Sequence, residues 1–107
     1  MTAAAKRLQT EAVNLVRRML EALDAGHYED AELVYEKGGG WYQDIHQIPG
    51  RIAWYLLRRA LIRREAWEGG MEHYLPAPEA RVFVRNPDAL TLEVAMRADA
   101  ARREKAE

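Results

Sequence analysis

Apolar side chains recur at helical spacing along the first quarter of the chain, and this stripe restricts the fold more than any other feature. The stripe consists of Leu8, Ala12, Leu15, Val16, Met19, Leu20 and Leu23. Charged and polar side chains take the opposite side, so the pattern predicts a helix from Thr2 or Ala3 to Leu23 or Asp24. Gly26 follows as a usual C-terminal stop. Because one face of such a helix has to be buried, other segments must supply a core against it.

The chain is long enough to supply that core. It has 107 residues, of which 49% are hydrophobic and 31% charged, an ordinary composition for one globular domain. We expect a single domain over residues 1–97, followed by a charged tail over residues 98–107 that is either a frayed helix or disordered. The formal net charge of -1 argues against a generally cationic binder, so binding to nucleic acid would require a local patch.

The sequence lacks the residues that several kinds of chemistry require. Without cysteine there are no disulfides, thiolate metal ligands or cysteine nucleophiles. His27, His46 and His73 fall in different segments and show no paired ligand spacing, so we expect no metal site, no cofactor and no enzymatic activity. No apolar run approaches the ~20 residues of a membrane span. We therefore expect a cytoplasmic protein without a membrane partner.

The segment after the first helix admits two interpretations. The residues from Tyr28 to Tyr35 could form a short helix after a tight turn, whereas a strand over Glu32–Glu36 is the rival reading. The sequence of Gly26–Gly38, with its ordered Gly, Tyr and Ala, resembles the middle of a tetratricopeptide unit. The likeness covers about a dozen residues and has no second copy at a ~34-residue period, so it implies no function. A further short helix is expected over Trp41–Gln47.

The stretch from Ile48 to Trp67 reads as one long helix that ends at Gly69 and Gly70. In a helical projection, its buried arc contains Ile52, Ala53, Leu56, Leu57, Ala60, Leu61 and Trp67. The opposite arc contains Arg51, Tyr55, Arg58, Arg59 and Ile62, with Arg63 and Arg64 at its margins. These arginines could pair with the acidic first half of the chain, or they could form a binding face that carries almost no acid.

The aromatic residues Trp41, Tyr42, Trp54, Tyr55 and Trp67 are concentrated in one third of the chain. Most of them are expected in the core, because a tryptophan contributes a large buried area to a small domain. If Trp54 or Tyr55 is exposed, it indicates a binding surface, since Trp, Tyr and Arg dominate the energetics of protein interfaces.

The residues from Arg81 to Met96 alternate between apolar and polar with period two, which predicts a β-hairpin. Asn86, Pro87, Asp88 and Ala89 separate the two runs with the preferences of a type I turn. The expected fold class is therefore α+β and mostly helical, with helices packed against a C-terminal β-hairpin.

The segment Trp41–Arg97 resembles a winged helix-turn-helix domain. The likeness rests on Ile45, Ile48, Ile52 and Leu56 around the Pro49-Gly50 turn, and on the hairpin that follows the long helix. It implies a DNA-binding regulator whose long helix enters the major groove, with a homodimer contact through the N-terminal helix. The residues expected to bind are Arg51, Tyr55, Arg58, Arg59, Ile62, Arg63, Arg81 and Arg85.

A protein-binding module is the alternative function. A small inhibitor or adaptor, of the kind phages use, could present the same arginine and tyrosine face to an acidic protein surface. Salt dependence separates the two classes, because binding through several phosphates weakens steeply as salt rises.

Overall fold

Helix α1 (Ala3–Ala25) confirms the amphipathic helix expected at the start of the chain. The hydroxyl of Thr2 accepts a hydrogen bond from the N–H of Ala5 and caps the first turn. Gly26 ends the helix in the left-handed conformation, with φ 80°. The buried residues of α1 are Ala12, Val13, Leu15, Val16, Met19 and Leu20. Most of the predicted stripe therefore enters the core.

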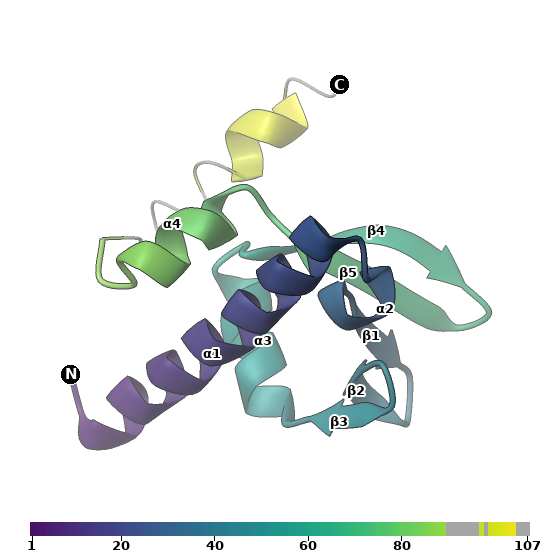
Figure 1. The fold of residues 1–107 in the computed structure, drawn as a ribbon, viewed down its shortest axis with the longest axis horizontal. Coiled ribbons are helices and arrows are strands. Elements are labelled where there is room, and N and C mark those ends of the chain that lie inside the picture. The colour runs from purple at the N-terminus through teal and green to yellow at the C-terminus, as the bar shows by residue number, and fades with distance from the viewer. Residues whose placement is uncertain (90–96, 98, 105–107) are drawn as a thin grey trace.

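The computed structural model describes residues 1–89, 97 and 99–104, whose arrangement is shown in Figure 1. After α1 come the short helix α2 (Tyr28–Ala31) and the strands β1 (Leu33–Glu36), β2 (Gly40–Gln43) and β3 (His46–Ile48). They are followed by helix α3 (Gly50–Arg58), strands β4 (Ile62–Glu68) and β5 (Met71–Pro76), and helix α4 (Glu79–Arg85). The five strands form one antiparallel sheet in the order β3-β2-β1-β5-β4.

The expected fold class, mostly helical with a C-terminal β-hairpin of winged-helix type, is wrong, because the sheet occupies the middle of the chain. The first strand of the expected hairpin falls within α4. Ala80 and Phe83 are three residues apart and both fully buried on α4, so packing selects the helical period over the alternating one. The second expected strand, residues 90–96, lies outside the described residues.

The turn between the two runs is confirmed, since the N–H of Ala89 donates to the carbonyl of Asn86 at 3.1 Å. Beyond it, residues 99–104 are helical. Arg102 on this segment forms ion pairs with Glu79 of α4 and with Asp99. These contacts hold the described part of the tail beside α4.

The single helix predicted from Ile48 to Trp67 is also wrong. Helix α3 ends at Arg58, and Ala60 takes a left-handed conformation, with φ 55°, before the chain enters β4. Gly69 and Gly70, with φ 60° and 82°, then form the two-residue turn into β5, which needs positive φ at both positions. Residues 62–68, expected in the second half of the helix, thus make their backbone hydrogen bonds within the hairpin of β4 and β5.

Pairing within the sheet also decides the secondary structure of the segment before α3. The strand reading of Glu32–Glu36 is confirmed by β1, whereas the short helix expected over Trp41–Gln47 is wrong, because these residues form β2 and part of β3. Gly38 and Gly40, with φ 85° and 101°, allow the tight reversal between β1 and β2. The tetratricopeptide likeness therefore does not extend to the fold.

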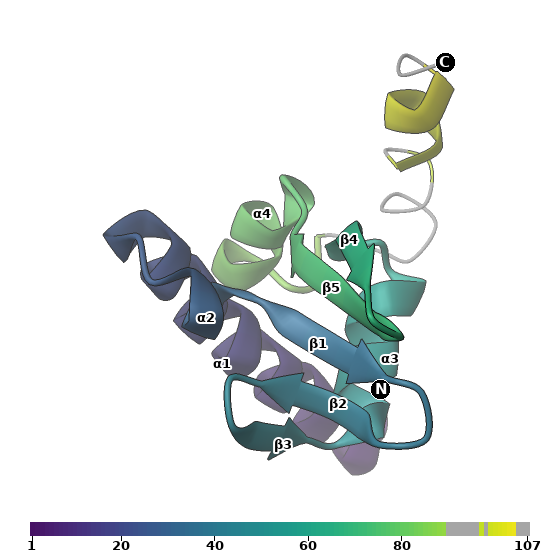
Figure 2. The ribbon, with the colours of Figure 1, turned by 90° about the vertical axis from the view of Figure 1, so that its right-hand side faces the viewer.

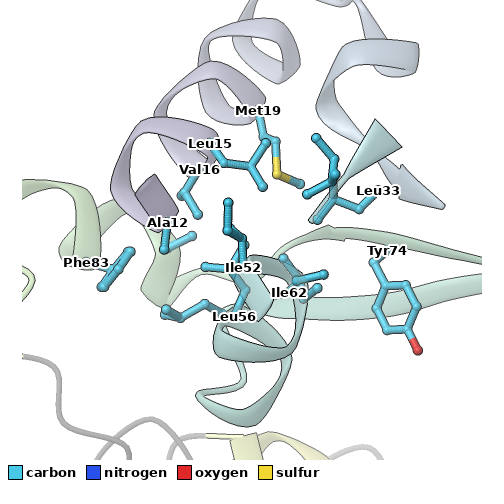
Figure 3. Packing of buried hydrophobic residues seen from close by; sticks show 14 of the residues in the cluster. Ala12, Leu15, Val16, Met19, Leu33, Ile52, Leu56, Ile62, Tyr74 and Phe83 are labelled. Carbon is cyan, nitrogen blue, oxygen red and sulfur yellow. The ribbon is translucent and has the colours of Figure 1, made fainter. Parts of the chain in front are cut away.

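Helices α1 and α3 pack on one side of the sheet, here called the helix-facing side (Figures 1 and 2). The opposite side, which Figure 2 shows toward the viewer, is open. Side chains that point to the helices include those of Leu33, Trp41 and Ile62, all buried. Figure 3 shows Ile52 of α3 lying between the α1 residues and Ile62 of the sheet, with Leu56 next to it. The core thus forms where α1, α3 and the sheet meet.

Replacing Ala60 with glycine tests the break between α3 and β4. The left-handed conformation costs a non-glycine residue about 1–2 kcal/mol, while glycine adds about 0.4–1 kcal/mol of entropy to the unfolded chain. We expect Ala60→Gly to leave the free energy of unfolding unchanged or to raise it by up to about 1 kcal/mol, as measured by urea titration. In a continuous helix, the same change would lower it by about 1 kcal/mol. Ala53→Gly, inside α3, is the matched control and should cost about 1 kcal/mol or more.

Candidate partner-binding surface

The predicted binding residues are distributed over three elements. Arg51, Tyr55 and Arg58 lie on α3, and Arg59 is its C-terminal cap. Arg63 lies on β4, and Arg81 and Arg85 lie on α4. Ile62 is only 2% exposed, because the chain turns it into the core at the start of β4. The structure therefore does not gather the predicted residues into one cationic ridge.

Three of the predicted arginines bind carboxylates of the same chain. Arg51 pairs with Glu11 at 3.2 Å, and Arg63 lies 3.9 Å from Asp99. The guanidinium of Arg81 donates to both carboxylate oxygens of Asp24, at 2.6 and 3.1 Å. These hydrogen bonds lower the pKa of Asp24 and raise the pKa of Arg81. Pairing with acidic residues thus accounts for much of the arginine pattern, although Asp99 lies outside the acidic first half.

The remaining predicted residues differ in their surroundings. The guanidinium of Arg59 stacks 3.6 Å from the centre of the Tyr55 ring and donates to the Tyr55 carbonyl at 3.3 Å. The Tyr55 ring in turn packs against Phe83 of α4, with 6.1 Å between ring centres. Arg58 and Arg85 are exposed and make no ion pair within the part of the chain that the structure describes.

An aromatic cluster surrounds Trp41 on the helix-facing side of the sheet. The Trp41 ring lies 4.9 Å from Tyr35 of β1, 5.2 Å from Tyr74 of β5 and 5.9 Å from Trp54 of α3, between ring centres. Trp41 itself is buried, as predicted, with only 3% of its surface exposed. Trp54 packs edge-on against it, yet remains 48% exposed. The indole of Trp54 is therefore held by the core and still faces solvent.

The strand register places Trp67 on the same side. Tyr35 lies opposite both Trp41 and Glu72, and Glu72 lies opposite Trp67. Because residues directly opposite one another in a sheet share a side, Trp67 continues this row to the edge strand β4. It is 71% exposed. We call Tyr35, Trp54 and Trp67 the aromatic surface, and the ring of Tyr74 is buried beside it.

The exposure of Trp67 differs from the prediction, because a continuous helix would have placed this residue on the buried arc. The available signal was Gly69-Gly70 between two short runs, which is a recognised hairpin pattern. Trp54 is 48% exposed, which is the condition under which the sequence predicts a binding surface.

Polar groups tie the aromatic surface together around Glu72. Arg64 donates to this carboxylate at 3.1 Å, and the Tyr74 hydroxyl donates to it at 3.1 Å. Figure 3 shows the Tyr74 ring at the margin of the core cluster, with its hydroxyl pointing away from it. Burial raises the pKa of Tyr74, and the hydrogen bond and negative charge of Glu72 raise it further. The phenol therefore stays protonated, and Glu72 remains its acceptor.

A cavity of about 350 Å³ borders this surface, between α3, β4 and the tail. Its lining includes Leu57, Arg64, Tyr74, Asp99 and Arg103. Leu57 and Arg58 lie three and four residues after Trp54, on the same flank of α3. One flank of α3 thus carries the Trp54 indole, Leu57 at the hollow and the Arg58 guanidinium, which has no ion pair within the described residues.

Metal chemistry finds no support among the described residues. They contain no group of three or more His, Asp and Glu side chains that could hold an ion. His73 lies 2.7 Å from Glu32 on the open side of the sheet, while His27 and His46 are exposed on other segments. Within the described ranges, no helix has both the length and the apolar character needed to cross a membrane.

Comparisons of the chain with protein-family models, with curated proteins and with solved structures found no match. The aromatic surface itself is therefore the basis for a functional proposal.

Replacing Glu72 with glutamine should lower the pKa of Tyr74, because it removes the carboxylate charge that disfavours the phenolate. Burial remains, so this pKa should stay above the ordinary value of about 10. A raised folded-state pKa stabilises the fold below pH about 10, and this stabilisation is lost as pH rises further. The alkaline loss should therefore be smaller in Glu72→Gln. Tyrosinate absorbance followed against pH measures the shift, with Tyr74→Phe identifying the contribution of Tyr74. An unchanged titration would show that Glu72 does not control this phenol.

Proposed function

We propose that the protein is a protein-binding module whose partner docks on the aromatic surface. The observation that carries the proposal is the exposure of Trp54 and Trp67 on one side of the sheet, at opposite ends of the row formed by Trp41, Tyr35 and Glu72. Tryptophan, tyrosine and arginine are the residues that most often dominate binding energy at protein interfaces. A partner that covers either indole gains on the order of 2 kcal/mol from it.

The charges around the surface favour a protein over a nucleic acid. Arg64 is bound to Glu72, and the exposed residue Glu65 lies two residues before Trp67 on β4. A phosphate backbone would approach these carboxylates with unfavourable charge, and the arginines expected to offset them are largely paired elsewhere. The exposed aromatic side chains with arginine beside them match the residue types that are enriched at protein interfaces.

The surroundings also indicate the chemistry of the partner. Arg58 has no carboxylate of its own chain nearby among the described residues, and it lies one helical turn after Trp54. A partner carboxylate beside an apolar recess would satisfy both side chains at once. The partner is thus expected to present an acidic group next to a pocket that receives the Trp54 indole.

Site-specific crosslinking tests the proposal. A photoreactive phenylalanine derivative is placed at position 67 and, for comparison, at the exposed position Val82 on α4. Protein crosslinked only from position 67 is identified, purified and titrated calorimetrically against the unmodified chain. Trp67→Ala and Trp54→Ala should each weaken binding at least about tenfold, and Arg58→Glu should weaken it through lost charge pairing. Val82→Ala should change it less than about twofold.

Stability controls keep the result interpretable. Trp67 makes no ring contact with another aromatic residue in the described part of the chain, so Trp67→Ala should unfold at nearly the same temperature as the unmodified protein. If Trp67→Ala and Trp54→Ala bind the partner as tightly as the unmodified chain does, the proposal is contradicted. Binding to random DNA duplex that weakens steeply with salt would instead support the nucleic-acid function.

A further inference from the structure

The strand β4 forms one end of the sheet, and its outer edge carries no neighbouring strand in the described ranges (Figure 2). It spans Ile62–Glu68 and is exposed from Arg64 onward. An open edge presents unpaired backbone N–H and C=O groups, which favour the addition of another strand. This edge lies beside the exposed indole of Trp67, so it is an interaction site in its own right.

The register shows which backbone groups point outward near the turn. The two-residue turn at Gly69 and Gly70 is closed by Glu68 and Met71, which form the hydrogen-bonded pair of a hairpin with positive φ at both turn positions. Hydrogen-bonded and non-bonded pairs alternate along an antiparallel ladder. Trp67, opposite Glu72, therefore directs its N–H and C=O away from β5.

The register at the other end of β4 also shows which backbone groups point outward. Ile62 lies opposite Pro76, which has no N–H to donate, so this pair is of the non-bonded type. Arg64, two residues further on and opposite Tyr74, is then also of this type. The register shifts between Arg64 and Ala66, which accounts for the odd spacing from Arg64 to Trp67. Both residues thus offer free backbone groups at the outer edge.

We propose that β4 pairs with β4 of a second copy of this chain, antiparallel about a two-fold axis between Glu65 and Ala66. In this register, Arg64 lies opposite Trp67 of the second copy, so residues with free backbone groups meet. Arg63 lies opposite Glu68 of the second copy. Because Leu75 and Met71, their respective partners on β5, share the open side, Arg63 and Glu68 also share it. The arrangement is self-complementary, as a two-fold interface requires.

Side-chain chemistry selects this register over the other symmetric ones. Centring the pair on Arg64 would place two arginines opposite one another, and like charges directly opposite are unfavourable. Centring it on Trp67 would run into the glycine turn and shorten the overlap. The chosen register instead joins Arg63 to a carboxylate and places the Arg64 guanidinium beside an indole, a favourable cation–π arrangement. The charges along β4 disfavour pairing with most other strands, but they are complementary to a second copy of β4 in this register.

This proposal goes beyond the partner-binding function and does not depend on it. Pairing through β4 would extend the sheet through both copies and bring their two Trp67 side chains to one continuous side. Trp54 and Arg58 are not involved, and Arg63 and Glu68 lie on the open side, away from the aromatic surface. Variants at these two positions therefore separate self-association from partner binding.

Reversal of single charges in the full chain tests the register. Self-association is measured by sedimentation equilibrium and by light scattering over a range of protein concentrations. Arg63→Glu places two acids opposite one another, and Glu68→Arg places two arginines opposite one another, so each should weaken the dimer at least about tenfold. An equal mixture of the two variants should form heterodimers, because each position then faces its opposite charge. The double variant should dimerise with itself for the same reason.

The mixture is decisive because Arg63 also contacts Asp99 of its own chain at 3.9 Å. Damage to that contact lowers the stability of Arg63→Glu but cannot produce a heterodimer with Glu68→Arg. Arg85→Glu, an equal charge change on α4, is the control and should dimerise like the unmodified chain. A chain that stays monomeric throughout overturns the proposal. A dimer whose affinity is unchanged by both charge reversals also overturns the proposal, because the contact would then lie elsewhere, for instance on α1.

Discussion

The burial of the apolar face of α1 is the interaction on which the rest of the structure depends. Leu15, Val16 and Met19 are essentially inaccessible to water. The burial of each side chain contributes about 1.5–3 kcal/mol to the stability of the fold. Together with Leu33 of the sheet and Leu56 of α3, they form the centre of the core. This contact fixes α3 beside α1 and holds both helices against one side of the sheet (Figure 3).

The aromatic surface is a direct consequence of that arrangement. Helices α1 and α3 pack on the helix-facing side of the five-stranded sheet but leave Trp67 of the edge strand β4 exposed there. There, the row of Tyr35, Glu72 and Trp67 continues beyond the buried Trp41. Trp54 belongs to both regions, because its ring packs on Trp41 while nearly half of it stays exposed. Packing on Trp41 restricts the Trp54 side chain before a partner binds, which lowers the entropy cost of binding.

The arginines illustrate how folding changes the meaning of a charge pattern. On a straight helix, Arg51 through Arg64 form a ridge without acids, but the turn at Ala60 sends part of them onto β4. Arg51 then meets Glu11, and Arg64 meets Glu72. Exposed pairs of this kind add little to stability, about 0–1 kcal/mol each. Their effect is to neutralise charge at the surface, so that the aromatic side chains become its main feature.

The long amphipathic helix α1 was determined by the sequence alone, whereas the elements from α3 onward were decided by tertiary contacts. The stripe of α1, its end at Gly26 and the turn at Asn86 could be predicted, because many residues or a local conformational preference carry each signal. The β4 segment and α4 could not, because Ile62–Glu68 has too few apolar side chains to distinguish a helix from a strand, and Glu79–Arg85 fits both a helical and an alternating period. Sheet pairing with β5 selected the strand for Ile62, and burial against α1 selected the helix for Phe83. Exposure of Trp67 followed from the first of these choices, so only the assembled sheet could reveal the candidate site.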